Sequence, residues 1–331
     1  MKYVPFGQTG QQVSAMGLGT MMFGERCAEA EADHILGKAV EHGVNFLDTA
    51  AMYAGGRTEE ILGRILKGRR DKLFIGTKVH KGIDAGSILG SIDESLARMR
   101  LDYVDLYMVH WPVPGMRPAE IMEALNQVVV QGKARYVGCC NYPAWLVAHS
   151  NAIAERNGWA SLVCNQVAYN LVERGVEVEI LPQARAEQIA ITVYRPLAAG
   201  LLAGKYQAGG ALPPDSRAQS EARLLTWLAQ YSDSLDRFHQ FALKRALHPA
   251  QLALAWVSYS PAVTAPIVGV SSLAQLETSL GAFEIELTAD EYAELTYLFD
   301  TEVKEEGLQR FPGLRYNFPR LRRNLNLISR D

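Results

Sequence analysis

Four side chains that could act together in catalysis lie in the first third of the chain: Asp48, Tyr53, Lys78 and His110. Asp48 ends an apolar run typical of a short buried strand, and Tyr53 follows five residues later on an expected loop. Lys78 closes another apolar run, where its ammonium needs an anion such as Asp48 to remain charged. We expect this cation to lower the pKa of the Tyr53 phenol, about 10 when unperturbed, so that Tyr53 becomes a general acid near neutrality.

His110 has two readings when it is taken alone. It could be a core histidine satisfied by the backbone, or a neutral imidazole that donates a hydrogen bond to a carbonyl oxygen gaining negative charge. The neighbouring acid, cation and carboxylate favour the second. An acid held over a carbonyl needs a hydride donor, and no side chain supplies hydride, so a reduced nicotinamide is the expected cofactor.

The elements that would position these residues alternate along the chain. An N-terminal hairpin over 3–14 has its turn at 7–10, and a long Gly/Pro-rich loop covers about 200–222, where we expect a functional loop or lid. Eight apolar runs read as strands: 15–20, 45–48, 72–79, 102–110, 134–141, 162–166, 189–195 and 265–269. Helical patterns cover 28–41, 58–66, 85–99, 118–131, 143–156, 179–186, 249–259 and, as the last helix, 273–282.

This order predicts a closed parallel α/β barrel, the (β/α)₈ or TIM barrel, in one domain over 1–331 with a hairpin cap (1–14) and a tail from about 300. Six polar residues recur every 25 to 32 positions, each at the C-terminal end of its strand: Asp48, Lys78, His110, Asn141, Gln166 and Arg195. In such barrels that face carries the active site. One such residue could be a solvated loop residue, but six in phase predict a common site.

The same face would have to hold the cofactor, because the chain has no G-x-G-x-x-G between a strand and a helix. Asn141 and Gln166 could bind a carboxamide, and Tyr194 could stack on a nicotinamide ring. Arg195 and Lys205 could lie near a pyrophosphate. Tyr194 is also compatible with a core aromatic, and Lys205 with a solvated loop charge.

Composition and net charge limit the kinds of binding partner that we expect. The 331 residues carry a net charge of −3 and 48% hydrophobic residues, typical of a globular protein with a large core and without an electrostatic reason to bind nucleic acid or anionic membranes. No signal-peptide pattern or run of 18 apolar residues occurs, so a cytoplasmic location is expected. The four cysteines lack metal-ligand or C-x-x-C spacing, which favours buried reduced thiols and no metal.

The chain resembles the aldo-keto reductases from the hairpin to at least residue 283. The resemblance rests on Asp48-Thr49-Ala50 with Tyr53, the run Thr58-Glu59-Glu60-Ile61-Leu62-Gly63, Thr77-Lys78 and the strand before His110. It implies that Tyr53 is the proton donor, that Lys78 and Asp48 lower its pKa, and that His110 positions the carbonyl. The branch indicated includes the potassium-channel β-subunits and bacterial general-stress oxidoreductases.

The resemblance also extends the cofactor contacts. They are Thr20, Met21, Asp48, Cys140, Asn141, Gln166, Tyr194, Arg195, Pro196, Leu197, Ala199, Lys205, Arg217, Gly269, Ser271 and Gln275. Cys140 and Arg195 each replace a usual Ser, and Thr278-Ser279 replaces a usual Glu-Asn pair. NADPH is the expected cofactor, with recognition of its 2′-phosphate by Arg217 and Lys205. NADH is left open because residues 263–279 contain no Lys or Arg.

Substrate identity is less constrained. Met22, Phe23 and Trp111, with Met52 and Tyr142 nearby, predict a pocket for an apolar or aromatic small-molecule carbonyl. Two function classes follow: a carbonyl-reducing oxidoreductase, favoured by the intact set of four, and a cofactor-sensing regulatory subunit that binds a partner. The basic and aromatic residues after 310 favour a solvated or subunit-packing segment over a nucleic-acid arm, and a homo-oligomer is left open.

Overall fold

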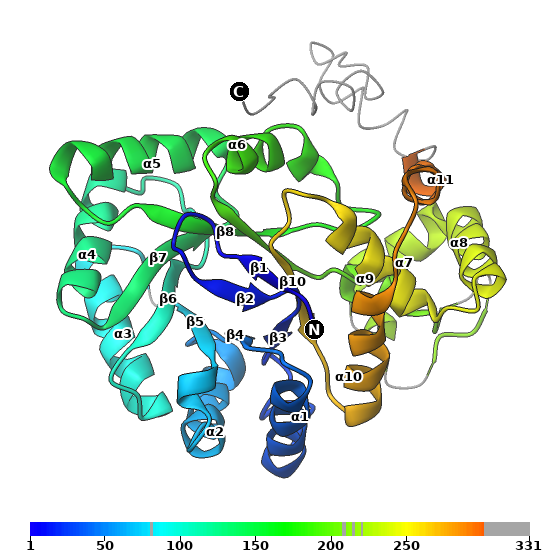
Figure 1. The fold of residues 1–331 in the computed structure, drawn as a ribbon, viewed down its shortest axis with the longest axis horizontal. Coiled ribbons are helices and arrows are strands. Elements are labelled where there is room, and N and C mark those ends of the chain that lie inside the picture. Colours follow the sequence, from blue (N-terminus) through cyan, green and yellow to red (C-terminus); the bar gives the residue numbers. More distant parts are fainter. Residues whose placement is uncertain (80–81, 207–209, 214–215, 220, 301–331) are drawn as a thin grey trace.

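A closed barrel of eight parallel strands forms the centre of the computed structural model, which describes residues 1–79, 82–206, 210–213, 216–219 and 221–300 (Figure 1). The strand order around the barrel is β10-β3-β4-β5-β6-β7-β8-β9. These strands are β3 (Gly17–Gly19), β4 (Phe46–Asp48), β5 (Phe74–Lys78), β6 (Val104–Val109), β7 (Ala134–Cys140), β8 (Leu162–Ala168), β9 (Ala190–Tyr194) and β10 (Ala265–Gly269). The predicted (β/α)₈ fold is confirmed.

Helices surround the barrel and connect successive strands, as Figure 1 shows. They are α1 (Glu29–Glu41), α2 (Arg57–Ile65), α3 (Ala85–Met99), α4 (Pro118–Val130), α5 (Ala144–Asn157), α6 (Ile180–Ala186), α7 (Ala222–Gln230), α8 (Ser232–Lys244), α9 (Pro249–Tyr259), α10 (Leu273–Leu280) and α11 (Ala289–Asp300). Short 3-10 turns are η1 (Tyr53–Gly56), η2 (Arg70–Lys72), η3 (Gly175–Glu177), η4 (Ala198–Ala203), η5 (Arg217–Gln219) and η6 (Gly281–Glu284).

The N-terminal hairpin, β1 (Tyr3–Pro5) and β2 (Gln12–Ser14), closes the end of the barrel where the strands begin. Phe6 is fully buried, with its ring centroid 4.7 Å from that of Phe74 and 5.8 Å from that of Phe46. These residues form one small core cluster with Val13 and with side chains from several barrel strands. The expected cap is therefore an apolar plug.

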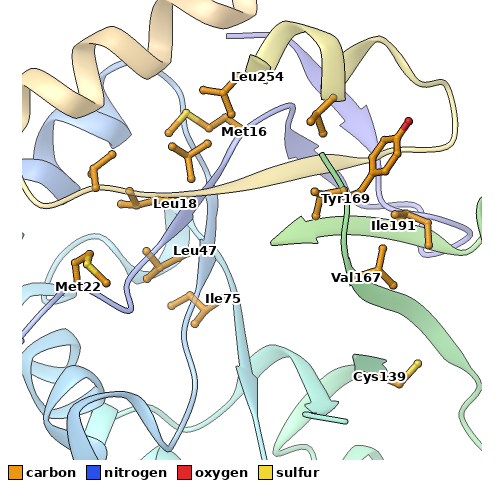
Figure 2. Close-up of a cluster of buried hydrophobic side chains, with 14 of the residues drawn as sticks. Met16, Leu18, Met22, Leu47, Ile75, Cys139, Val167, Tyr169, Ile191 and Leu254 are labelled. Atoms are coloured by element: carbon orange, nitrogen blue, oxygen red, sulfur yellow. The ribbon is translucent and has the colours of Figure 1, made fainter. Parts of the chain in front are cut away.

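Alternation along each strand separates the two faces of the barrel wall. Leu18, Leu47 and Ile75 are paired neighbours on β3, β4 and β5 and belong to the large core between barrel and helices, where Figure 2 shows them together. Phe46 belongs instead to the cluster inside the barrel. Because side chains alternate with period two, Asp48 shares the inner face with Phe46. The spacing of two residues between Phe46 and Asp48 therefore directs the Asp48 carboxylate into the barrel.

Close packing around β3, the first strand of the barrel, involves a glycine at position 17. A Cβ built at Gly17 would lie 2.5 Å from Cδ1 of Ile267 and 3.0 Å from Cδ1 of Phe46. These are shorter than van der Waals contacts, so a larger residue would force the Ile267 and Phe46 side chains to move. Gly17 thus lets both side chains pack directly against this short strand.

The last part of the fold differs from the sequence-based prediction. The expected final helix over 273–282 is α10 followed by η6, but a further helix, α11, covers Ala289–Asp300. Leu295, Leu298 and Phe299 bury its apolar face. The prediction that α10 is the last helix is therefore wrong. The expected tail from about residue 300 lies, beyond Asp300, outside the described residues.

Candidate active site

A buried ion pair lies at the C-terminal end of the barrel. The Lys78 ammonium donates to both carboxylate oxygens of Asp48 and to the carbonyl of Thr49, each at 2.8 Å. Lys78 is fully buried and Asp48 is 2% exposed. Burial works to lower the pKa of Lys78, but the charge of Asp48 outweighs it and the pKa lies above its usual value. Lys78 is therefore a fixed cation.

Two further residues hold Asp48. The Gln166 amide donates to Oδ1 of Asp48 at 2.8 Å, and the Thr20 hydroxyl donates to the Asp48 carbonyl at 3.0 Å. Both partners are buried. We predicted Gln166 and Thr20 as cofactor contacts, and the structure brings Gln166 to the Asp48 carboxylate and Thr20 to the Asp48 main-chain carbonyl. Asp48 is thereby occupied as an acceptor, which favours a role in holding Lys78 over a role in proton transfer.

Tyr53 begins the η1 turn five residues after Asp48 ends β4, and Ala54 (φ 46°), Gly55 and Gly56 in this turn adopt left-handed backbone conformations. The turn brings the centroid of the Tyr53 ring to 5.3 Å from the Lys78 ammonium. Burial raises the pKa of the Tyr53 phenol above its ordinary value, and Lys78 opposes this by its charge and by a side-chain hydrogen bond. The expected net lowering of this pKa is wrong, because burial and the Asp48 charge outweigh the cation.

His110 follows β6 and is half-buried. Its ring centroid lies 6.4 Å from that of Tyr53 in an edge-on arrangement and 4.3 Å from that of Trp111. A phenol and an imidazole that face the same opening can both approach one carbonyl oxygen, one as proton donor and one as hydrogen-bond donor. The structure thus brings together all four residues selected from the sequence.

The predicted nicotinamide contacts occupy the neighbouring strand ends. Asn141 (φ 57°) follows β7, and its side-chain oxygen accepts a hydrogen bond of 2.9 Å from the Tyr194 hydroxyl at the end of β9. Cys140 is buried beside them, and burial raises the pKa of its thiol. An amide beside a half-exposed aromatic ring is a donor set that suits a planar carboxamide-bearing ring. These residues fit the nicotinamide end of the expected cofactor.

The segment after β9 carries two exposed cations, Arg195 and Lys205. Arg195 (φ 54°) is exposed, with its guanidinium carbon 5.7 Å from the centroid of the Tyr194 ring. Lys205 is also exposed, and a Cβ built at Gly200 (φ 100°) would lie 3.4 Å from its ammonium. Pro196 and Ala199 are buried, and Leu197 is half-buried. Exposed cations on either side of a tight turn suit a pyrophosphate.

The predicted contacts at β10 lie at the start of α10. The Gln275 side chain accepts from the Ser271 amide at 2.9 Å, and Gly269 is exposed at the end of β10. The Leu273 amide donates to the Glu31 carboxylate at 3.0 Å. Sequence reasoning missed Glu31, because its partner lies more than 200 positions away. Arg217 begins η5, and its side chain lies outside the described part of the structure.

The substrate-pocket prediction changes most. Met22 and Phe23 lie in the hydrophobic core, and Figure 2 shows Met22 among the core side chains. Trp111, predicted for the pocket, and Met52, expected beside it, are exposed near the strand ends. Met21, predicted as a cofactor contact, and Val113 are exposed there as well. Tyr142, which we expected near this pocket, is also buried in the core. The prediction failed because the chain folds back after β3. This fold-back buries Met22 and Phe23 and leaves only the first of the three consecutive apolar residues, Met21, exposed.

Three polar residues between the barrel and its helices, on the outer side of the strand that carries Lys78, had no role assigned from the sequence. Glu59 and Thr77 are buried and form a hydrogen-bonded polar group with the half-buried Arg98 at the strand that ends in Lys78. Glu59 and Thr77 lie within the runs that carried the family resemblance, and Arg98 does not. Only the three-dimensional packing of α2, β5 and α3 identifies their contact. Among the described residues no cluster of three or more metal-ligating side chains occurs.

A TIM barrel with an aspartate, lysine, tyrosine and histidine at its C-terminal opening defines a class of oxidoreductase scaffold. Sequence comparison agrees, because the model of the aldo/keto reductase family matches residues 15–299. The chain belongs to the aldo/keto reductase family. It is 34% identical over 307 residues to the uncharacterized oxidoreductase YrpG of Bacillus subtilis (strain 168), covering 87% of this chain and 92% of the relative.

A second relative is protein tas of Escherichia coli (strain K12), 31% identical over 335 residues that cover 89% of this chain and 96% of tas. Protein tas of Shigella flexneri matches to the same extent. These similarities run over nearly the whole length of each chain. Within the described residues, no helix combines the length and hydropathy needed to span a membrane. The expected cytoplasmic location stays a prediction.

Proposed function

We propose that this protein reduces aldehydes or ketones to alcohols with NADPH, and that Tyr53 donates the proton. The observation that carries the proposal is the fully buried Lys78 ammonium, which is bonded to Asp48 and lies 5.3 Å from the centroid of the Tyr53 ring. Membership in the aldo/keto reductase family and the name of the oxidoreductase YrpG support the same reaction class.

A bound nicotinamide would supply a hydride to the carbonyl carbon, and the chain's own residues manage the oxygen. The raised pKa of Tyr53 keeps the phenol protonated at neutral pH, as a proton donor must be. When the proton passes to the carbonyl oxygen, the phenolate forms beside the Lys78 cation. Asp48 keeps that cation in place. His110 would orient the oxygen by a hydrogen bond.

The cofactor part of the proposal has its own support. Asn141 and Tyr194 would hold the nicotinamide end, while Arg195 and Lys205 would lie near the pyrophosphate. Recognition of a 2′-phosphate would depend on Arg217 and Lys205, because the region around α10 offers no Lys or Arg and places Glu31 at the first turn of the helix. NADH is therefore the alternative cofactor.

The exposed apolar residues at the opening support an apolar or aromatic substrate. Met21, Met52 and Trp111 are between 37% and 48% exposed, which is unusual for such large apolar side chains in one region. Their burial against a bound substrate would remove apolar area from water. We therefore propose aromatic and long-chain aldehydes ahead of small hydrophilic ones.

The test measures NADPH consumption with 4-nitrobenzaldehyde, together with fluorescence-quenching titrations of NADPH and NADH. We expect one alcohol formed for each NADPH consumed, and tighter binding of NADPH. Cofactor binding without turnover on any of a panel of aldehydes and ketones would contradict the enzymatic proposal and favour the regulatory alternative. Tighter binding of NADH would contradict the cofactor choice alone.

A further inference from the structure

A buried carboxylate lies behind the candidate active site, in the layer between barrel and helices. Glu59, in the first turns of α2, is 0% exposed. One of its oxygens accepts a hydrogen bond of 2.6 Å from the Thr77 hydroxyl, and the other accepts one of 2.8 Å from Nε of Arg98. The second guanidinium nitrogen of Arg98 lies 2.8 Å from that same oxygen. The carboxylate is thus paired on both sides.

The first of these contacts leads to Lys78. Thr77 is the residue before Lys78 in β5, and adjacent strand residues point to opposite faces. The Thr77 hydroxyl therefore reaches outward to α2 while the Lys78 side chain reaches inward to Asp48. Any movement of Thr77 relative to α2 moves the strand end that carries the ammonium. The hydrogen bond from Thr77 to Glu59 fixes that end.

The second contact leads to Tyr53. The η1 turn that begins with Tyr53 ends at Gly56, and α2 follows without a break. A Cβ built at Gly56 would lie 3.1 Å from Cδ of Arg98, so the arginine stem packs against this turn. A Cβ at Gly63 would lie 2.4 Å from the Arg98 carbonyl oxygen. Arg98 therefore sets the position of both the turn and the helix after it.

We propose that Glu59 is a positioning residue, which fixes the distance between Lys78 and Tyr53 through Thr77 on one side and Arg98 on the other. This inference rests on the proposed function, because it gives that distance a catalytic purpose. Proton transfer depends steeply on the placement of the reacting groups, and a displacement of about 1 Å can lower a rate by about a hundredfold. Glu59 itself touches neither substrate nor cofactor.

The simpler reading is that the three residues only stabilise the packing of α2 and α3. In that case the pair of Glu59 and Arg98 matters only for stability, because removing one partner leaves an uncompensated buried charge. The two readings differ in what a mild substitution changes. Loss of packing lowers the melting temperature and leaves kcat per folded molecule unchanged, whereas loss of positioning lowers kcat and leaves cofactor affinity unchanged.

The test compares Thr77→Val with Thr77→Ser and Glu59→Gln. Thr77→Val keeps the shape and removes the hydroxyl, so we expect kcat for aldehyde reduction to fall by about tenfold or more, with the cofactor Kd from fluorescence quenching within about twofold. Thr77→Ser keeps the hydroxyl and should restore kcat to within about threefold of wild type. Glu59→Gln can still accept from Thr77 but loses the charge facing Arg98, so its kcat should lie between the two.

A matched control is Thr296→Val in α11. The Thr296 hydroxyl is equally buried and accepts a hydrogen bond of 2.9 Å from the Trp256 indole, at a distance in the fold from the barrel opening. If Thr77→Val keeps kcat within twofold of this control while both lose similar thermal stability, the positioning role is overturned. If wild type itself shows no turnover, or if Tyr53→Phe is fully active, the proposed function has failed instead.

Discussion

At the scale of single residues, the arrangement depends on how the charges are balanced around Lys78. Its ammonium is fully buried and satisfied by Asp48 and the Thr49 carbonyl. Asp48 is itself held by Gln166. The raised pKa of Lys78 keeps it charged at every physiological pH. Tyr53, whose ring centroid lies 5.3 Å from this ammonium, is the residue that we propose as the proton donor.

The pKa of Tyr53 gives the first prediction at this scale. Burial raises it above the ordinary value of about 10, against the opposing effect of Lys78. A group with a raised pKa stays protonated up to that higher pH, so Tyr53 in the free protein should not ionise between pH 7 and about 10. The measurement is the tyrosinate absorbance of wild type minus that of Tyr53→Phe during alkaline titration.

We expect this difference to stay flat until the pH exceeds about 10. A step of one tyrosinate below about pH 9 would contradict the balance described above and would show that Lys78 dominates. Lys78→Met, which removes the opposing charge, should move any observed step to still higher pH. Tyr107, also buried but bonded to a backbone carbonyl of α3, is present in both proteins and cancels from the difference.

Individual site residues were predictable to different degrees. Asp48, Lys78 and His110 could be selected from the sequence because they recur at strand ends with one spacing. The exposure of Met21 and the burial of Met22 could not, since both follow the same short strand and only the turn after it decides which side chain enters the core. The sign of the Tyr53 pKa shift also depends on the burial that the folded structure creates.

At the scale of elements, most helices and strands followed from apolar periodicity, and one helix that the prediction left out has a visible signal in the sequence. The missed helix α11 begins with a capping box, in which the Glu291 amide donates to the Thr288 hydroxyl at 3.2 Å and the Thr288 amide donates to the Glu291 carboxylate at 2.9 Å. The Thr-x-x-Glu pattern could have predicted this start. The contact of Glu59 with Thr77 and Arg98 could not be predicted, because it joins three elements.

The hairpin offers the prediction that belongs to this scale. Phe6→Ala removes the ring that packs against Phe46 and Phe74 inside the barrel, and should lower the free energy of unfolding by about 3–5 kcal/mol. The cofactor Kd and kcat should stay within twofold of wild type, because the plug lies at the end of the barrel opposite the candidate site. Denaturant unfolding and the aldehyde assay measure the two quantities.

Tyr3→Phe is the control, since Tyr3 lies on the exposed side of the same hairpin and its hydroxyl donates to the Gly43 carbonyl. Its effect on stability should be below about 1 kcal/mol. A tenfold loss of kcat in Phe6→Ala, at a temperature where the variant is fully folded, would contradict the separation of the two ends of the barrel.

At the scale of the whole molecule, the fold divides its tasks between the two ends of one barrel. The end where strands begin is filled by Phe6 and its neighbours, and the end where they finish carries the polar residues. This division is general for TIM barrels, where residues at the C-terminal ends of strands perform chemistry. It explains why sequence order alone located most of the candidate site in this member of the aldo/keto reductase family.

The central claim is that Tyr53 donates the proton in carbonyl reduction, and Tyr53→Phe tests it most directly. The variant keeps the ring beside Lys78 and removes only the hydroxyl. In the NADPH and 4-nitrobenzaldehyde assay, kcat should fall by at least about a hundredfold, which is the range for loss of a general acid, while the NADPH Kd stays within twofold. Turnover by Tyr53→Phe equal to that of wild type would contradict the account.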